Sequence, residues 1–488
     1  MYKFDVLIVG NGVLGLSTAY ALTLENPNLK IGILGPFHRN GGATLAAGAM
    51  LNCFSEIGRL TFQSKHSINK FKLAQKALKL WPSWIEQMNA HLDPIDRIKI
   101  RPGTFILLNT KSGQRETENY LAIRKALLDE QELFEDIEPS EIPGLNPVDD
   151  ARPLRSLYLP NEGFINPTRL LLALEKVLRK IGHVTFIDDT ASQLLLDGYQ
   201  VIGTKTQLDN TIHAAKVLLA AGAYTQRLID QIPELVHRIP KIMAGTGCAI
   251  HLEFDNNQFE NVVRTPLRAG SCGAHIVPQD NKKMVYLGAS NSIRIHPHAL
   301  AKARDIYYLL EHSMEQFNKH LGDAKVVKYE VGNRPMTFDG FPLIGKTSTI
   351  TDLWILTGTY RDGILNSPLF STYLTKEILY ADESLFKHEF QPERAPLETM
   401  PQSRMIEELA EQFISVGYEH GIKIPQLYSG LNVRNIIIRH IQSIYEALEI
   451  PFGLAPDVLI MLHYMPEMIP MFKDYYKAVE KEFACAAV

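Results

Sequence analysis

The sequence predicts a chain of the α/β class (α+β overall), in which a parallel sheet with helices is interrupted by a mixed or antiparallel sheet. Two apolar runs near the N-terminus, FDVLIVG and NLKIGILG, flank a helical pattern, and strand, helix and strand in this order form a βαβ unit with parallel strands. Residues 238–346 read mainly as short strands joined by loops, which is typical of an inserted second sheet. Residues beyond 402 are mostly helical and form a C-terminal extension.

Length and composition indicate a soluble protein with several domains. A chain of 488 residues exceeds what one core supports, and 45% hydrophobic with 21% charged residues is ordinary for globular proteins. The net charge of −4 disfavours a nucleic-acid binder or a polybasic membrane anchor. Four scattered cysteines without a CxxC pair indicate neither a disulfide framework nor a metal site. No apolar run reaches the ~20 residues of a membrane span, and the N-terminus reads as a strand, so a cytoplasmic location is expected.

The order of strands, helices and loops predicts how the domains alternate along the chain. Helices are expected at 64–90 and at 166–182, the second with Asn166 as its N-cap and Pro167 in its first turn. A proline- and charge-rich stretch precedes the extension and reads as a linker. The expected parts are a discontinuous first domain (1–92, 150–232 and 330–388), an inserted second domain (93–149 and 233–329), a linker (389–402) and the extension (403–488).

The turn after the first apolar run carries a chemical signal. GNGVLG places Gly10, Gly12 and Gly15 in the spacing G-x-G-x-x-G, between a strand and a helix. There the first glycine makes the tight turn, the second lets a pyrophosphate approach the backbone, and the third lets helix and strand pack closely. The free N–H groups at the start of the helix then bind the phosphates. The pattern predicts a dinucleotide site; the alternative is a glycine turn in an α/β domain that binds no ligand.

The adenosine end of such a site lacks its usual acidic residue. An Asp or Glu is expected about twenty positions after the glycines, but this chain has Gly35 and Pro36 there. Backbone groups, His38 or Asn40 would have to hold the ribose. The lack of an acidic residue at this position disfavours NAD as the cofactor. Arg39 could favour NADP, but it contributes only a single positive charge.

The stretch from Gly41 to Met50 consists almost entirely of Gly, Ala and Thr. It is too apolar for an ordinary loop, and as a core helix it would pack poorly. The composition favours a segment on which a flat, bulky group lies at close range. A close contact between two helices is the alternative.

Six motifs occur in order along the chain: GNGVLGLSTAYAL, GATLAAGAML, GFINPTRLLLAL, VLLAAGAY, GNRPMTFDGFPLIG and LTGTYRDGILNSP. Together they resemble the FAD-dependent D-amino-acid oxidase superfamily, and most closely its glycine oxidase and sarcosine oxidase-like members. The resemblance covers roughly residues 4–385. It implies a Rossmann-like FAD-binding domain, an inserted substrate-binding domain and FAD as the cofactor.

The resemblance further implies an extended FAD that is bound noncovalently. Related sarcosine oxidases attach flavin through a cysteine, but the nearest match in this chain is Gly332. Besides the three glycines of the turn, the resemblance implies which residues contact each part of FAD. The ADP end would be contacted by Val13, Leu14, Gly35, Ala43 and Thr44, and the adenine by Ser192. The face of the flavin ring would lie on Gly48, Ala49 and Met50, and the ring would be surrounded by Thr359, Tyr360, Arg361, Asp362, Gly363, Ile364 and Leu365.

Three residues are candidates for the reaction itself. Arg334 matches the family arginine that binds the substrate carboxylate, a role that suits a planar guanidinium; alternatively it pairs with Asp339. Arg361 matches a second family arginine near flavin and substrate, or has a structural role. His275 stands where glycine oxidases carry a tyrosine, and it either accepts the amine proton or is a hydrogen-bonded strand histidine.

The function implied by the resemblance is oxidation of the Cα–N bond of a small amino acid or secondary amine acid. Hydride passes to flavin N5, and O2 reoxidises the flavin to give H2O2. Two other functions of the same fold stay open, an amino-acid dehydrogenase and a biosynthetic amine or imine oxidase, which would use another electron acceptor or a modified amino acid. A non-catalytic flavin-binding partner protein is a function of another class. Substrate identity and stereochemistry are not determined.

The C-terminal extension is additional to the resemblance, since glycine oxidases similar to this core end near Leu379. Its apolar helical faces and the methionine-rich run from Met461 to Met471 are adaptable packing surfaces. Packing on the catalytic core is expected, with a homo-oligomer contact, a protein partner or a lid as alternatives. The expected small-molecule partners are the amino-acid or amine substrate and O2, with no nucleic acid and no transmembrane segment.

Overall fold

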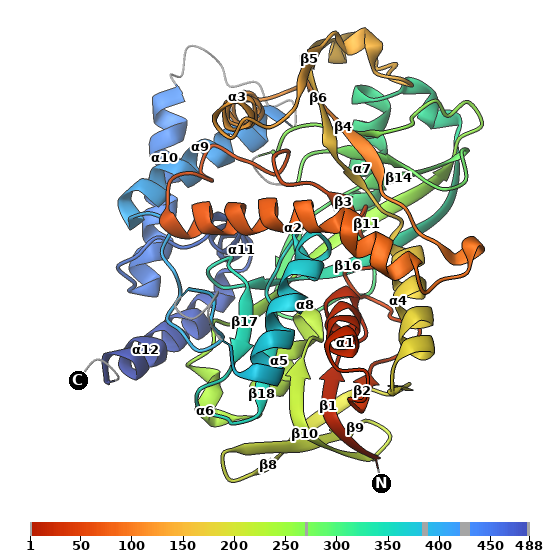
Figure 1. Cartoon of the computed structure of the whole chain (residues 1–488). Coiled ribbons are helices and arrows are strands. Elements are labelled where there is room, and N and C mark those ends of the chain that lie inside the picture. The colour runs from red at the N-terminus through yellow and green to blue at the C-terminus, as the bar shows by residue number, and fades with distance from the viewer. Residues whose placement is uncertain (1, 269–271, 383–388, 420–429, 486–488) are drawn as a thin grey trace.

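The computed structural model describes residues 2–268, 272–382, 389–419 and 430–485. Two sheets form the framework: the first lies at the end of the molecule that holds the N-terminus, and the second lies at the opposite end (Figure 1). The expected mixture of helices and sheets and the helical C-terminal region are confirmed. Within the described residues no helix combines the length and the apolar character needed to cross a membrane.

The first sheet is built around the first apolar run, which forms β1 (Tyr2–Val9). This strand pairs in parallel with β2 (Ile31–Leu34) on one side and with β10 (Thr211–Leu219) on the other. Every residue of β2 is buried, as expected for a parallel strand that is covered on both faces. The sheet is completed by parallel β7 (Val184–Ile187) and β18 (Leu353–Thr357), antiparallel β17 (Leu343–Lys346), and the hairpin of β8 (Ala191–Asp197) and β9 (Gln200–Thr206).

Helices cover the first sheet, and their starting residues follow the predicted capping signals. α1 (Val13–Glu25) follows the glycine turn and packs against α4 (Pro167–Ile181) and α8 (Gly363–Tyr380). The Asn166 side chain accepts a hydrogen bond from the Arg169 N–H at 3.1 Å, which confirms the predicted N-cap of α4. The other helices of the two domains are α2 (Lys65–Asn89), α3 (Gln114–Asp129), α5 (Thr225–Ile229), α6 (Pro233–Val236) and α7 (Ala303–Gln316).

The second sheet is mainly antiparallel. Its longest pairing joins β11 (Ile242–Glu253) to β16 (Lys325–Thr337), and places Gly245 beside Arg334. Residues from 150 onwards are expected in the first domain, whereas β6 (Pro153–Phe164) pairs with β4 (Arg101–Asn109) and is part of the second sheet. Its other strands are β3 (Met50–Leu51), β4 (Arg101–Asn109), β5 (Glu135–Ile137), β12 (Val262–Arg264), β13 (His275–Pro278), β14 (Met284–Gly288) and β15 (Ser292–Arg294).

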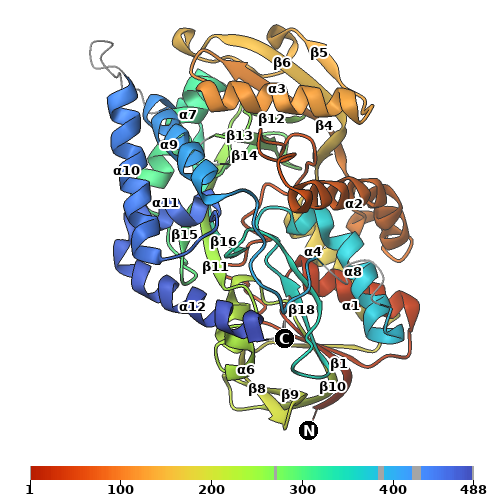
Figure 2. The ribbon, with the colours of Figure 1, turned by 90° about the vertical axis from the view of Figure 1, so that its left-hand side faces the viewer.

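The C-terminal extension packs against β11, β15 and β16 (Figure 2). The Phe338 ring lies 4.7 Å from the ring of Phe472 and 4.6 Å from that of Tyr476, centroid to centroid. The preceding segment is also held on the core, since Phe390 is buried and Arg394 pairs with Asp339. The helices of the extension are α9 (Gln402–Glu419), α10 (Gly430–Leu448), α11 (Pro456–Tyr464) and α12 (Ile469–Cys485).

Candidate active site

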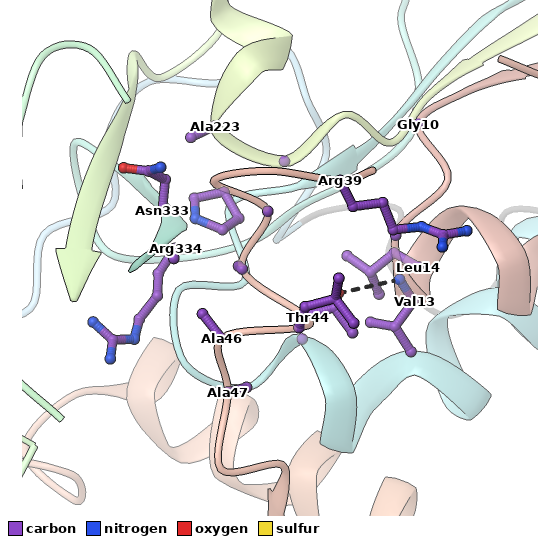
Figure 3. A pocket seen from close by; sticks show the side chains of 18 of the residues that line it. Gly10, Val13, Leu14, Arg39, Thr44, Ala46, Ala47, Ala223, Asn333 and Arg334 are labelled. Carbon is purple, nitrogen blue, oxygen red and sulfur yellow. Dashed lines mark hydrogen bonds between the residues drawn. The ribbon is translucent and has the colours of Figure 1, made fainter. Parts of the chain in front are cut away.

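A cavity of about 630 Å³ lies where the two sheets meet, at the carboxyl end of β1. Of the residues expected to contact the cofactor or the substrate, all line this cavity except Gly15. Figure 3 shows Arg39 at one side of the cavity and Arg334 at the other, with the segment that carries Thr44, Ala46 and Ala47 between them. The structure therefore brings together residues from Val9 near the N-terminus to Leu365.

The three glycines of the turn have different surroundings. A Cβ on Gly10, whose φ is +123°, would lie 2.3 Å from the Ala220 carbonyl oxygen. A Cβ on Gly15 would lie 2.0 Å from the Gly10 carbonyl oxygen, so this glycine lets α1 pack closely on the turn. A Cβ on Gly12 would meet nothing nearer than Thr44 Oγ1 at 3.5 Å, an ordinary contact. The space beside Gly12 is thus open to a ligand.

The start of α1 faces the cavity beside the small-residue segment. The Val13 N–H donates a hydrogen bond to Thr44 Oγ1 at 3.3 Å, drawn as the dashed line in Figure 3. Val13 and Leu14 line the cavity together with Ala43 and Thr44. Free N–H groups and the positive end of the helix dipole at this position favour an anionic group such as a pyrophosphate.

At the adenosine end, the charge of Arg39 is already compensated. Its Nε donates to the Asn11 carbonyl oxygen at 2.9 Å, and its guanidinium pairs with Glu175. An arginine held in this way is poorly placed to bind a 2′-phosphate, which disfavours NADP. Ser192 lines the cavity near Gln231, whose amide donates to the Ser192 carbonyl oxygen at 2.9 Å.

Arg334 stands on β16 and extends into the other end of the cavity. Its Nη1 donates to the Ser290 carbonyl oxygen at 3.2 Å and to Asn291 Oδ1 at 3.3 Å. A Cβ on Gly247 would lie 2.4 Å from this Nη1, so the glycine on the neighbouring strand leaves room for the guanidinium. These acceptors are neutral, so they leave the charge of Arg334 without a counterion.

The proposed alternative of an Arg334–Asp339 pair is wrong. Asp339 pairs with Arg394, and its Oδ2 also accepts from the Leu397 N–H at 2.9 Å. Among the residues that the structure describes, Arg334 forms no ion pair with any carboxylate. A half-buried guanidinium that faces a cavity and pairs with no carboxylate of the described residues is suited to bind an anion from outside.

Arg361 lies on the wall of the same cavity beside Glu56. Its Nη1 is 3.7 Å from Glu56 Oε2 and is buried without a hydrogen-bond partner among the described residues. Glu56 also pairs with the fully buried Arg264. Burial acts to raise the pKa of Glu56, but Arg264 and Arg361 outweigh it and hold this pKa below its ordinary value. Glu56 therefore stays ionised and fixes the position of Arg361.

His275 is buried in the cavity wall, with 3% of its surface exposed. Its Nδ1 lies 3.3 Å from the Gly273 carbonyl oxygen, which can only accept, so Nδ1 carries the proton in this contact. Its ring stacks on that of Tyr286 at 5.9 Å between centroids. Burial, with a smaller contribution from Arg264, lowers the pKa of His275 to about 3. The neutral imidazole is therefore a weak proton acceptor, and the structure favours the hydrogen-bonded strand histidine over a base.

The low pKa of His275 predicts a specific pH dependence of stability. Because this pKa lies below the ordinary value of about 6.5, the unfolded chain binds an extra proton between pH 3 and 6.5. The free energy of unfolding should then fall as the pH falls through this window, by up to about 1.4 kcal/mol per pH unit from this group. Urea unfolding of wild type and His275→Gln at pH 7.0, 6.0 and 5.0 should show a shallower decline for the variant; equal slopes would contradict the assignment.

Several residues that line the cavity or support its walls gave no usable signal in the sequence. Tyr286 donates from its hydroxyl to the Ala46 carbonyl oxygen at 3.0 Å and so braces the small-residue segment. Glu162 accepts from the Cys53 N–H at 2.6 Å and holds the chain after that segment. Asn291 reaches the arginine from the residue before β15, and Asn333 reaches the cavity from within β16. Tyrosine and asparagine are common in strands and loops, so only the pairing of the strands identifies them.

The lining of the cavity fits FAD on four observations. Backbone and small side chains from Gly41 to Met50 form a close-fitting wall, the space beside Gly12 is open, and the start of α1 faces it. At the other end Arg361 Nη1 is buried without a hydrogen bond among the described residues. In the described part of the chain, no group of His, Cys, Asp and Glu side chains could hold a metal ion.

Comparisons with known proteins agree with this arrangement. The chain is 23% identical over 386 residues to the glycine oxidase of Geobacillus kaustophilus, covering 79% of this chain and 95% of that protein. It is 24% identical over 380 residues to the bifunctional protein ThiO/ThiG of Trichormus variabilis, and this match spans only 52% of that protein's length. The crystal structure of glycine oxidase from Geobacillus kaustophilus superimposes with a TM-score of 0.67 and 21% identity, over 81% of this chain and 100% of that one.

The family model described as FAD dependent oxidoreductase matches residues 5–377. This match spans both sheets, the glycine turn and the segment from Thr359 to Leu365, and leaves out the C-terminal extension. FAD is the cofactor of this family, in agreement with the lining of the cavity. The chain belongs to the FAD-dependent oxidoreductase family.

Proposed function

We propose that this protein oxidises the Cα–N bond of a small amino acid or secondary amine acid with FAD. The observation that carries the proposal is the uncompensated charge of Arg334, directed into the cavity whose far end is suited to the ADP part of FAD. A substrate carboxylate would supply the missing counterion. The similarity to glycine oxidase supports the same class of substrate.

The residues of this chain orient and enclose the substrate in the proposed reaction. Arg334 binds the carboxylate through its planar guanidinium, and the hydrogen bond to Asn291 Oδ1 keeps the guanidinium in place. Burial raises the pKa of Tyr360, which therefore stays protonated beside the cavity. FAD, when bound, accepts the hydride from Cα, which is the chemistry that no side chain supplies. Position and exclusion of water are then the main contributions of the protein.

Flavin reduction by candidate substrates tests this function. The purified protein is expected to be yellow, and acid precipitation should release the flavin because FAD is held without a covalent bond. Anaerobic addition of glycine, sarcosine, and both enantiomers of alanine and proline should bleach the flavin with at least one of them. On admission of air, peroxide indicates O2 as the acceptor, whereas bleaching without peroxide indicates a dehydrogenase. A yellow protein that no amine bleaches would contradict the proposal.

A further inference from the structure

Asp457 connects the C-terminal extension to the proposed substrate site. It lies in the first turn of α11, and its Oδ1 is 3.4 Å from Asn291 Nδ2, which donates to it. The same amide donates to the Tyr360 hydroxyl oxygen at 2.5 Å, and its Oδ1 accepts from Arg334 at 3.3 Å. A single amide therefore separates the proposed carboxylate-binding arginine from a carboxylate of the extension.

A second cavity, of about 280 Å³, opens at this point. It adjoins the larger cavity at Glu56 and Arg361, which line both. One wall comes from the extension, whose helices α9 and α11 lie beside the second sheet (Figure 2). The extension contributes Glu408, Gln412, Pro456 and Asp457 to this wall.

Most charges around the second cavity are already compensated. Arg59 and Arg115 both pair with Glu118 and with Glu408. Arg59 Nε, Glu408 Oε2 and Gln412 Oε1 of this lining have no hydrogen-bond partner among the described residues. Two further groups lie near the wall that the two cavities share. In the described part of the chain Asp457 forms no ion pair and Arg361 Nη1 has no hydrogen-bond partner. At the wall shared with the larger cavity, Asp457 thus offers an acceptor and Arg361 Nη1 offers a donor that a ligand could satisfy together.

We propose that the second cavity binds the distal end of the substrate, and that this end is an uncharged polar group such as a primary carboxamide. The inference rests on the function proposed above. With the carboxylate on Arg334, a short chain that passes Arg361 enters the second cavity. There the amide N–H groups donate to Asp457, and the amide oxygen accepts from Arg361. An apolar end would leave Arg361 Nη1 without a partner and Asp457 with only its hydrogen bond from Asn291, which lowers affinity. Asp457 is thus a specificity-determining residue supplied by the extension.

Binding of unreactive carboxylates to the holoenzyme tests the inference. Succinamate and 4-methylpentanoate have the same shape, lack the amine and cannot be oxidised, and a ligand beside the flavin shifts its absorbance. Wild type is expected to bind succinamate at least tenfold more tightly than 4-methylpentanoate. Asp457→Ala should reduce this preference to about one, and Asp457→Asn should reduce it severalfold. Asp474→Ala is the matched control, because Asp474 is an exposed acid on α12 of the same extension.

The outcomes separate this inference from the proposed function. The second cavity is not a substrate site if wild type binds the two carboxylates equally, or if both Asp457 variants keep the wild-type preference. In either case, binding of acetate to the holoenzyme would leave the proposed function intact. If neither acetate nor the longer carboxylates perturb the flavin of wild type, the proposed function fails as well. Flavin content and the thermal transition of each variant show that the comparison is made on folded holoenzyme.

Discussion

Arg334→Ala is expected to lower kcat/KM for the amine substrate by roughly 10²- to 10³-fold. The guanidinium faces the cavity with only neutral acceptors around it, so the substrate carboxylate is its proposed counterion. Leaving that carboxylate buried without a partner costs about 3–4 kcal/mol, and each 1.36 kcal/mol is a factor of ten in rate. Anaerobic stopped-flow measurement of flavin reduction against substrate concentration gives the effect directly.

Two further variants show whether the loss comes from the geometry of the guanidinium. Arg334→Lys keeps the positive charge but not the paired donors, and should retain an intermediate rate. Arg152→Ala removes an exposed arginine and should reduce the flavin at the wild-type rate. Flavin content should be equal in all three proteins. A wild-type rate for Arg334→Ala with bound flavin would place the carboxylate elsewhere.

Gly12→Ala and Gly15→Ala are expected to fail in different ways, although they lie three positions apart. Gly12 has a φ of −76°, which alanine adopts readily, and its added Cβ would touch only Thr44 Oγ1 at 3.5 Å. Because Gly12 is also the N-cap of α1, where alanine is the poorer residue, the apo-protein should keep its stability to within about 1 kcal/mol. The methyl group would occupy the space where the pyrophosphate approaches the backbone, so FAD should bind roughly 10- to 100-fold more weakly.

Gly15→Ala acts on the fold itself. Alanine is the better helix former by about 1 kcal/mol, but its Cβ would lie 2.0 Å from the Gly10 carbonyl oxygen. Backbone atoms cannot move aside as a flexible side chain can, so α1 must shift and the apo-protein should lose about 1–3 kcal/mol. Thermal unfolding of the apo-proteins and FAD titration separate the two variants. Equal losses of apo stability would contradict the different roles assigned to the two glycines.

The sequence alone was sufficient for the parts of the fold that depend on neighbouring residues. The runs that became β1 and β2, the glycine turn and the capped helix at Asn166 depend on local periodicity and capping, and all were predictable. The family followed from several motifs in register, and the match over residues 5–377 confirms it. The domain boundary near residue 150 was less predictable, since β6 joins the second sheet through pairing with a distant strand.

What only the tertiary structure decided is which charges meet. In sequence Asp339 follows Arg334 by only five positions, yet it pairs with Arg394, and Arg334 remains free to face the cavity. Asp457 lies more than a hundred residues beyond Arg334, and a single asparagine side chain links the two. Spacing along the chain determines local structure, because turns and helices form between near neighbours. Electrostatic contacts depend on distance in space, which strand pairing and helix packing determine.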